Sequence, residues 1–563
     1  MTTCAPPPGA TVAVIGAGAT GSFFSHFVAN VTRGLGVSID VYEASDRIGG
    51  RAASSNDGGD VVELGASMII KQNRYFAEAS NGLTLEQPRP SADGVSLLAV
   101  LGEGRRFEFE EDEKSTLKTL WRMHRTYGLL NLAALRRHGS DFIRNFTRLY
   151  EAQDAGKAYE TPLALLETAA LDRWPLMSCS DALSRSLPRW MRTSRHGETS
   201  LLAPNIARGL IAGLMRNNYG HDAWAQSGAL CCFTAVAPLA AGGSKAARRV
   251  AEGNARVMEQ LLERSGANVH LSHRVTSIGI AVSGQEVSPP GTPPTSPSYE
   301  VKASRADGTS MTRHYSHVVL ALPNPPASLL SMNSHTSAGR RAPVALAYQH
   351  VHTTLLWGVL DPTYFGQPMR ALAKVNSIAD VLVGDDAAAE VPFFSLGRVG
   401  YRALSETSEA RAKGVAAACQ RAMGDEKDGR TALTEVPRWK LFSQNAMSES
   451  DLRALFLYMD ESAIVRHAWD APGAYPRSRP VTMDELNASF ILHDMGSANG
   501  GGMVVHASAV EMATSAMEVM AVAARNAALL VARRVHAQGP PQGYEIATGE
   551  ECSQQRQAAQ PKS

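Results

Sequence analysis

Three glycines near the start of the chain have the spacing of a phosphate-binding turn. Gly16, Gly18 and Gly21 form a GxGxxG pattern within VAVIGAGATGSFF. In such a turn the first glycine permits a sharp bend, the second lets the backbone approach a pyrophosphate, and the third lets the next helix pack on the strand. Ala17 and Thr20 lie inside the pattern, so we expect them beside the same phosphates, at the positive end of the helix dipole.

A carboxylate follows the glycine pattern at the sequence spacing typical of a ribose-binding acid. Glu43 comes 22 residues after Gly21, at the predicted end of the second strand, where an acid accepts hydrogen bonds from the ribose hydroxyls. A negative charge at this point also disfavours the additional phosphate of NADP. A glycine-rich turn without a ligand is the alternative, but it does not explain why strand, helix, strand and acid follow one another in register.

The next stretch favours FAD over NAD. It reads EASDRIGGR, in which Gly49 and Gly50 permit a close approach of the backbone and Arg51 supplies a cation suited to a pyrophosphate. A surface salt bridge is the alternative role for Arg51. The later segment ELGAS is a turn of small residues that we expect beside a flat ring, formed by Gly65, Ala66 and Ser67.

The hydrophobic pattern supplies the elements that position these residues. Residues 12–15 predict a buried strand, residues 23–31 repeat with helical spacing, and residues 37–43 alternate as a second strand. Together they predict a βαβ unit, the building block of a doubly wound α/β sheet.

Farther along the chain, helical and sheet-like regions alternate. Residues 76–218 have a largely helical pattern, and strands are predicted within 268–282 and 317–323. The proline- and serine-rich residues 284–298 between these strands predict a hairpin loop.

The C-terminal part of the chain combines one strong helical pattern with a polar tail. Residues 507–534 predict a single helix on which Glu511, Ser515 and Glu518 share one face. Residues 537–563 have the composition of a disordered tail.

The composition argues against two classes of partner. Of the 563 residues 44% are hydrophobic and 19% are charged, as in soluble globular proteins with a large core. The formal net charge is +1 and no basic patch is visible, so nucleic acid is not an expected partner. Residues 224–244 are uncharged and long enough to span a bilayer, but they contain Pro238 and three glycines. They therefore predict buried protein interior and no transmembrane segment.

The cysteines do not predict a metal site or a disulfide framework. No CxxC pair or His/Cys cluster has the spacing of a zinc site, and disulfides are uncommon in chains of this size. We therefore expect free thiols at all six positions, which are Cys4, Cys179, Cys231, Cys232, Cys419 and Cys552.

The combined motifs resemble those of the two-domain FAD oxidoreductases, which include amine oxidases, phytoene desaturases and prenylcysteine oxidases. In those families GGR follows the ribose-binding glutamate at this interval, and a later strand contributes a valine to the adenine pocket, matched here by Val275 in HRVTSI. Four other segments are similar to the prenylcysteine oxidase family in particular: GLMRNNYGHDAW, LAAGGSKAARRV, AYPRSRP and SAVEMATSAMEVMAVAARNAALL. The last segment places Glu511 at a position of the family's cofactor site. The similarity covers about residues 10 to 535.

The resemblance implies an α/β fold in which a Rossmann-like FAD-binding domain is interleaved with a substrate domain that contains a helical region. The FAD-binding domain would comprise residues 10–75, 230–330 and 490–536, and the substrate domain residues 76–229 and 331–489.

The resemblance also implies a reaction. FAD would accept a hydride from the carbon bonded to sulfur in farnesyl- or geranylgeranylcysteine, and water would add to that carbon. Cysteine and a prenyl aldehyde would leave, and oxygen would become hydrogen peroxide. Such a reaction belongs to the breakdown of prenylated proteins. Family members work in lysosomes or vacuoles, whereas MTTCAPPPGA lacks the basic and apolar parts of a signal peptide, so the compartment stays open.

Hydride loss from a thioether needs no protein base, so we do not expect a catalytic dyad. Tyr219 and His221 are the candidates for orienting the amino-acid end or the attacking water, with ordinary core roles as the alternative. Two other functions stay open. One is a flavin oxidase or desaturase that acts on amines or polyenes. The other is a prenyl-binding protein like the GDP dissociation inhibitors, although their phosphate turns are degraded and this turn is intact.

Overall fold

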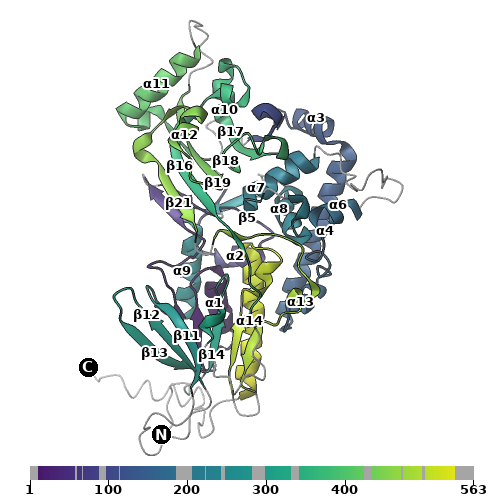
Figure 1. The fold of residues 1–563 in the computed structure, drawn as a ribbon, viewed down its shortest axis with the longest axis vertical. Coiled ribbons are helices and arrows are strands. Elements are labelled where there is room, and N and C mark those ends of the chain that lie inside the picture. Colours follow the sequence, from purple (N-terminus) through teal and green to yellow (C-terminus); the bar gives the residue numbers. More distant parts are fainter. Residues whose placement is uncertain are drawn as a thin grey trace, which may run out of the picture.

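The computed structural model describes residues 10–57, 60–65, 67–87, 97–112, 115–185, 206–221, 224–242, 247–281, 298–330, 342–423, 433–470, 473–496 and 501–538. These residues form an elongated molecule with one large sheet towards each end (Figure 1). The loop predicted at 284–298 lies outside the described residues apart from its last one, and so does the predicted tail beyond residue 538.

A six-stranded sheet forms the dinucleotide-binding part of the molecule. Its spatial order is β10 (Asn268–His270), β2 (Ser38–Tyr42), β1 (Thr11–Ile15), β14 (His317–Leu320), β24 (Met503–His506) and β23 (Ile491–Asp494). All neighbours are parallel except β23 and β24. Strands from the start, middle and end of the chain therefore lie side by side, which confirms the predicted Rossmann-like α/β architecture.

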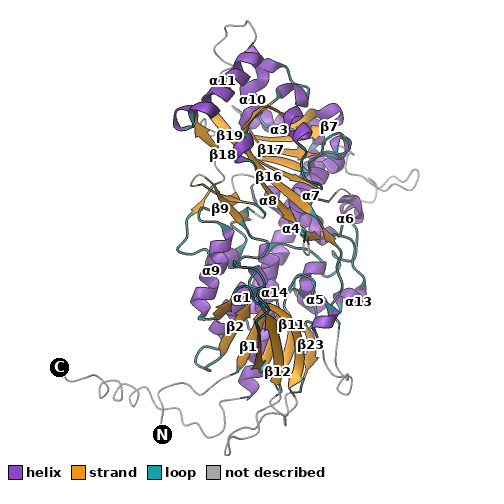
Figure 2. Cartoon of the chain, turned by 60° about the vertical axis from the view of Figure 1, so that its left-hand side comes forward, coloured by secondary structure: helices purple, strands orange, loops and turns teal. Residues whose placement is uncertain are grey.

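The two faces of this sheet are covered differently. Val12 and Val14 pack against the helices α1 (Ala19–Val31), α9 (Asn254–Ser265) and α14 (Met517–Gln538), which Figure 2 shows between this sheet and the rest of the molecule. Ala13 and Ile15 point the other way, because successive strand residues alternate between faces. They pack against a three-stranded sheet formed by β11 (Arg274–Ala281), β12 (Ser298–Ser304) and β13 (Ser310–Tyr315).

An eight-stranded sheet forms the second body. Its spatial order is β20 (Phe456–Met459), β16 (Val351–Leu360), β19 (Glu435–Ser443), β18 (Ser395–Ala403), β17 (Ile378–Val383), β7 (Leu97–Gly102) and β8 (Arg106–Glu110), and β21 (Val465–Trp469) also pairs with β16. Helix α12 (Glu449–Leu455) packs on one face of it and α11 (Glu409–Met423) on the other, while α10 (Leu372–Ser377) contributes a residue to each of these clusters. Strands β7 and β8 fall inside the region with a largely helical pattern, because periodicity alone does not separate a short apolar strand from a buried helix.

Helices form a third layer beside both sheets (Figure 1). They are α3 (Thr116–Tyr127), α4 (Leu129–Asp154), α5 (Pro162–Glu167), α6 (Cys179–Arg185), α7 (Ala212–Tyr219), which follows a π-helical turn at Ile206–Ile211, and α8 (Ala229–Ala241). Gly139 lets α4 and α8 approach closely, since a Cβ atom there would lie 2.5 Å from the Ala240 Cβ. The uncharged segment predicted as protein interior contains α8, which is largely buried. Within the described residues, no helix is long and apolar enough to cross a bilayer.

Short elements connect these layers. They are the hairpin of β3 (Ser54–Asp57) and β4 (Asp60–Glu63), the small sheet of β5 (Ile69–Ile70), β9 (Ala247–Val250) and β6 (Leu85–Glu86), the pair β15 (Tyr348–Gln349) and β22 (Tyr475–Pro476), and the helices α2 (Arg74–Ala79) and α13 (Met483–Leu486). The division of the chain into two discontinuous domains at the predicted residue limits stays a prediction.

The closing helix begins later than the sequence predicts. Helix α14 begins at Met517, and Ala509–Met512 form a separate 3-10 turn. Between them, the Ser515 hydroxyl donates to the Glu511 carboxylate, a local bond that competes with helix formation. The prediction of one continuous helix with Glu511 and Glu518 on a shared face is therefore wrong.

Glu518 instead completes a neighbouring helix. Its carboxylate accepts the N–H groups of Tyr75 at 2.8 Å and Phe76 at 2.9 Å, and the Tyr150 hydroxyl at 2.6 Å. Tyr75 and Phe76 lie in the first turn of α2, where N–H groups have no partner inside the helix. Burial raises the pKa of Glu518 to about 7.

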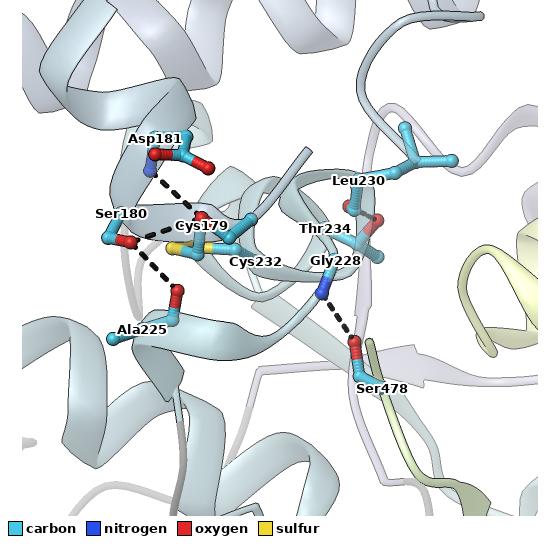
Figure 3. The surroundings of a disulfide bond; sticks show 10 residues. Cys179, Ser180, Asp181, Ala225, Gly228, Leu230, Cys232, Thr234 and Ser478 are labelled. Atoms are coloured by element: carbon cyan, nitrogen blue, oxygen red, sulfur yellow. Dashed lines mark hydrogen bonds between the residues drawn. A yellow bond between two sulfur atoms is a disulfide. The ribbon is translucent and has the colours of Figure 1, made fainter. Parts of the chain in front are cut away.

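The expectation of free thiols at every cysteine is also wrong. Cys179 at the start of α6 and Cys232 in α8 form a disulfide, with their Cα atoms 5.8 Å apart (Figure 3). The sequence separation of 53 residues carries no sign of this pairing. Cys231 and Cys419 are free and buried. The bond holds α6 against α8 beside the β-bridge between Ser178 and Gly228.

We predict that Cys179 and Cys232 react with a thiol reagent in denaturant only after reduction, whereas Cys419 reacts without it. Mass spectrometry of labelled peptides measures this difference. The experiment uses a Cys231→Ser variant, so that a label on the peptide that contains Cys232 cannot come from the neighbouring thiol. Labelling of Cys179 in denatured, unreduced protein would contradict the pairing.

We predict that Glu518→Ala lowers the free energy of unfolding by about 2–4 kcal/mol, because three buried donors lose their acceptor. Thermal and denaturant unfolding measure the change. The matched control is Glu78→Ala on α2. Its side chain is 58% exposed in a surface pair with Arg74, so its loss should cost less than about 1 kcal/mol.

The effect of Glu518 should also depend on pH. Its folded-state pKa of about 7 lies above the ordinary value of 4.5, so the folded protein binds this proton more tightly than the unfolded chain does. The stabilisation is complete below about pH 4.5 and is lost as pH rises through about 7. The stability difference between wild type and Glu518→Ala should therefore shrink across this range, and a difference that grows would contradict the assignment.

Candidate functional site

One cavity of about 960 Å³ connects the parts of the molecule that the sequence singles out. Its walls come from the two glycine turns after β1 and β2, from the strands β17, β18 and β19, from the helices α4 and α8, and from the start of α14. The cavity therefore lies between the six-stranded sheet, the eight-stranded sheet and the helical layer.

The first glycine turn is shaped by close backbone contacts. Gly16 has a φ of +109°, and a Cβ atom there would lie 2.8 Å from the carbonyl oxygen of Ala321. A Cβ atom on Gly21 would lie 1.9 Å from the carbonyl oxygen of Gly16. Gly18 differs, because the atom nearest to its absent Cβ is 3.7 Å away and the residue borders the cavity. A larger side chain at Gly18 would therefore enter the cavity.

The second glycine turn lies directly against the first. Gly49 and Gly50 both have positive φ, +115° and +56°. The Gly49 N–H donates to the Ala17 carbonyl at 3.0 Å, and Gly18 and Gly49 form a parallel β-bridge. Both turns border the cavity, as does the buried Thr20. The segments that the sequence assigns to a pyrophosphate are thus brought together.

Glu43 follows β2 and holds the first turn in place. Its Oε2 accepts the N–H of Ala17 at 2.9 Å, and its Oε1 accepts the N–H and the hydroxyl of Ser45, both at 2.8 Å. A carboxylate has about four acceptor sites, so these bonds leave room on Oε2 for one hydroxyl. Glu43 borders the cavity, and β2 ends at Tyr42, one residue before it.

Val275 lies at the edge of this region. It is in β11 and packs on the core cluster between the six-stranded and three-stranded sheets, while its neighbour Arg274 borders the cavity. The chain reaches β11 past Glu43, whose carbonyl accepts the N–H of His273 at 2.8 Å. The assignment of Val275 to an adenine pocket stays a prediction.

Arg51 and Glu511 form an ion pair. The Arg51 Nη2 donates to the Glu511 Oε1 at 2.5 Å, and Nη1 donates to the Ala474 carbonyl at 3.0 Å. Glu511 also accepts the hydroxyls of Tyr348 at 3.0 Å and Ser515 at 2.8 Å. The Glu511 side chain is fully buried, whereas that of Arg51 is 30% exposed and borders the cavity. Burial opposes the charge of Arg51, but the Glu511 carboxylate raises the pKa of the guanidinium above its usual value.

The ELGAS turn meets a lysine that the sequence analysis did not single out. Gly65 is required by contact, since a Cβ atom there would lie 2.7 Å from the Arg51 carbonyl oxygen. The Lys440 Nζ lies 3.3 Å from the Glu63 carbonyl, 3.4 Å from the Gly65 carbonyl and 3.3 Å from the Ser67 hydroxyl. Burial lowers the pKa of Lys440 to about 8. Ala66 lies outside the described residues.

The two candidate catalytic residues occupy different environments. Tyr219, at the end of α7, borders the cavity, and its hydroxyl lies 3.3 Å from the Thr514 hydroxyl. Burial raises the pKa of Tyr219 well above its ordinary value. The His221 Nε2 lies 2.9 Å from the Ser478 carbonyl oxygen, and His221 is not among the described residues that line the cavity. Their roles in a reaction stay predictions.

The side of the cavity formed by α4 and α8 is mainly apolar. Helix α4 contributes Phe142, Ile143 and Phe146, and α8 contributes Ala235, Ala237 and Pro238. Helix α14 begins at the same cavity, with Ser515, Ala516 and Met517 on its wall. The unpaired N–H groups of a helix start favour negative charge nearby, so the cavity combines an apolar surface with a region suited to an electron-rich group.

The side formed by the eight-stranded sheet carries charged residues instead. Asp380, Arg398 and Lys440 from this sheet border the cavity, and so does Glu63 at the end of β4. Burial raises the pKa of Glu63 to about 7, and its Oε1 accepts the N–H of Asn254 at the start of α9. The only sequence signal for such residues is a charge within an apolar run, such as the lysine in RWKLF.

Comparisons with known proteins agree with this arrangement. The family described as prenylcysteine lyase matches residues 109–540, more than half of the chain, and the NAD(P)-binding Rossmann-like domain matches residues 14–79. The chain is 25% identical over 541 residues to farnesylcysteine lyase from Arabidopsis thaliana, a match that covers 93% of this chain and 88% of that protein. It is 26% identical over 545 residues to human prenylcysteine oxidase 1, with 94% and 90% covered.

A solved structure extends the comparison to the fold. Cyclohexylamine oxidase from Brevibacterium oxydans superposes with a TM-score of 0.52 at 16% identity, over 94% of this chain and 100% of that one. This likeness shows a shared fold, and the family match is more specific. The protein belongs to the prenylcysteine lyase family.

Proposed function

We propose that this protein is an FAD-dependent oxidase that cleaves the thioether of S-prenylated cysteine, with farnesylcysteine or geranylgeranylcysteine as substrate. The observation that carries the proposal is that one cavity borders both the glycine turns and the apolar surface of α4 and α8. Membership of the prenylcysteine lyase family supports the substrate class, as do the names farnesylcysteine lyase and prenylcysteine oxidase carried by relatives.

The residues around the glycine turns fit FAD. The two turns leave the backbone open to the cavity at Gly18 and Gly50, and Glu43 keeps acceptor capacity for a ribose hydroxyl. We assign the pyrophosphate to these turns with Arg51 beside it, and the flat ring system to the region of Gly65 and the start of α14. When bound, FAD takes up a hydride from the carbon attached to sulfur and passes the electrons to oxygen.

The protein's own residues bind and shield the substrate in this proposal. Burial of apolar groups contributes about 0.8 kcal/mol per CH₂, so Phe142, Ile143 and Phe146 supply the main attraction for a prenyl tail. The start of α14 stabilises nearby negative charge by about 0.3–1 kcal/mol. Tyr219 keeps its proton because its pKa is raised, so we assign it an orienting role and no role as a base.

The proposed reaction balances with oxygen and water as the other reactants. The carbon next to sulfur loses a hydride, water adds to it, and the carbon–sulfur bond breaks. Cysteine takes the sulfur and a proton, the former prenyl group leaves as an aldehyde, and oxygen gains two electrons and two protons as hydrogen peroxide.

We predict that purified protein carries a flavin and releases peroxide and prenyl aldehyde from S-farnesylcysteine, but not from cyclohexylamine. Gly18→Val should lose the visible flavin absorbance and the activity, because its side chain enters the cavity, whereas Gly18→Ala should keep part of both. Absorbance spectra and a coupled peroxide assay measure these outcomes. Peroxide release from amines alone would favour an amine oxidase, and a colourless wild-type protein would favour a prenyl-binding role.

We predict that Phe146→Ala lowers kcat/KM for S-farnesylcysteine by about 10- to 100-fold, since about 1.5–3 kcal/mol of apolar burial is lost. Flavin content should not change. The matched control is Leu129→Ala, on the same helix but 63% exposed, which should leave kcat/KM unaltered. Equal effects of both variants on kcat/KM would contradict the assignment of α4 to the surface that binds the prenyl tail.

A further inference from the structure

Three neighbouring strands place an acid and a base on one face of the eight-stranded sheet, with a glycine between them. Asp380 in β17 lies opposite Gly397 in β18, and Gly397 lies opposite Lys440 in β19. Residues directly opposite each other in antiparallel strands project to the same face. All three residues border the cavity. The missing side chain at Gly397 leaves the space between the two charges open.

The Asp380 carboxylate is not paired with another group in the part of the chain that the structure describes. Among the described residues it has no hydrogen bond and no ion pair within 4.0 Å; its electrostatic partners, Lys440 and Arg398, act from farther away. Burial raises the pKa of Asp380 above its usual value. A Cβ atom at Gly397 would lie 3.1 Å from the Asp380 Oδ1, so the glycine also keeps the carboxylate accessible from the cavity.

The neighbouring cations are equally short of charged partners. Within the described part of the chain, the Lys440 Nζ hydrogen-bonds to neutral oxygen atoms and lies 4.8 Å from the centre of the Phe442 ring, and it has no ion pair. The Arg398 Nε and Nη2 atoms are buried there without a hydrogen-bond partner, and Nη1 reaches the Asn376 carbonyl at 3.4 Å. Burying charges without direct partners costs folding free energy. A ligand that brought one cationic and one anionic group into this corner would lower that cost.

We propose that this corner binds the free amino-acid end of the substrate, with Asp380 receiving the α-ammonium group and Lys440 and Arg398 receiving the α-carboxylate. Adjacent strands lie about 4.8 Å apart, so Asp380 and Lys440 stand about two strand spacings from each other, which leaves room for a zwitterion between them. The inference rests on the proposed function and deepens it. The charged corner and the apolar surface of α4 would then hold opposite ends of one amphiphilic molecule.

A purely internal role is the competing explanation. In that case Asp380 and Lys440 balance each other's charge across Gly397 and stabilise the sheet without touching a ligand. The two explanations differ in one respect. If Asp380 binds the ligand, its substitution lowers kcat/KM only for ligands that carry the ammonium group. If its role is internal, the substitution lowers kcat/KM equally with and without that group.

The test compares S-farnesyl-L-cysteine with 3-(farnesylthio)propanoate, which lacks only the amino group. For wild type we expect kcat/KM to be about 10- to 100-fold lower with the propanoate, as for loss of a charged hydrogen bond. Asp380→Asn should lower kcat/KM by a similar factor with farnesylcysteine and by less than about threefold with the propanoate. Equal loss on both compounds would overturn the assignment.

The carboxylate side has its own comparison. Lys440→Met should lower kcat/KM for farnesylcysteine by about 10-fold or more and should have less effect on its methyl ester, which lacks the negative charge. The control is Asp386→Asn, since Asp386 is an exposed acid paired with Arg208 and is not among the described residues that line the cavity. It should change neither comparison. Should Asp380→Asn fail to fold, Gly397→Ala crowds the same carboxylate and should reduce the discrimination between farnesylcysteine and the propanoate.

Binding calorimetry without oxygen, on flavin-loaded protein whose flavin is already reduced so that no hydride transfer takes place, separates this inference from the proposed function. Tighter binding of farnesylcysteine than of the propanoate in wild type, and equal binding in Asp380→Asn, supports the site even if no peroxide is ever released. Peroxide release together with equal wild-type affinity for both compounds would overturn the site and leave the proposed function intact.

Discussion

The ion pair between Arg51 and Glu511 is the contact on which the arrangement of the site depends. It joins the second glycine turn to the segment before α14, which are 460 residues apart in the sequence. Tyr348 in β15 and Ala474, directly before β22, bind to the same pair. Four separate segments are therefore held at one point beside the cavity.

A buried ion pair of this kind does not by itself guarantee stability. Desolvation of the two charges offsets much of their attraction, whereas loss of one partner leaves an uncompensated charge and costs about 3–5 kcal/mol. Glu511 accepts three side-chain donors and is fully buried, so its position is strictly defined. The pair fixes how the closing segment meets the glycine turns, and this geometry determines where α14 begins on the cavity wall.

The parts of this arrangement that sequence predicts are those whose physical reasons are local. Gly21 is required by a contact with the Gly16 carbonyl in its own turn, and Glu43 binds Ala17 and Ser45 within the same βαβ unit. Such constraints leave a pattern of fixed spacing. The βαβ unit and the strands near residues 268 and 317 were predictable for the same reason, since each is a short apolar run with clear limits.

The features that sequence did not predict depend on partners far away in the chain. Asp380 and Lys440 lie on either side of Gly397 because β18 pairs with both β17 and β19. No residue spacing in the sequence indicates this strand register. The disulfide pairs two cysteines that helix packing brings together. The late start of α14 depends on the hydrogen-bond partners of Ser515 and Glu518. Ser515 bonds to Glu511, and Glu518 bonds to Tyr75 in α2. Helical periodicity in the sequence does not indicate that such side-chain hydrogen bonds compete with the start of a helix.

The distribution of charge within the cavity follows from the elements that form it. A strand in an eight-stranded sheet can direct a charged residue into a cavity while its neighbours in sequence remain in the core on the other face. Trp439 and Leu441, on either side of Lys440, are fully buried in this way. Helices α4 and α8 pack on each other through Gly139, so small and apolar residues dominate their shared surface. The sheet is thus suited to bind the polar end of a molecule and the helices its apolar end, and a substrate with both ends is oriented before any chemistry begins.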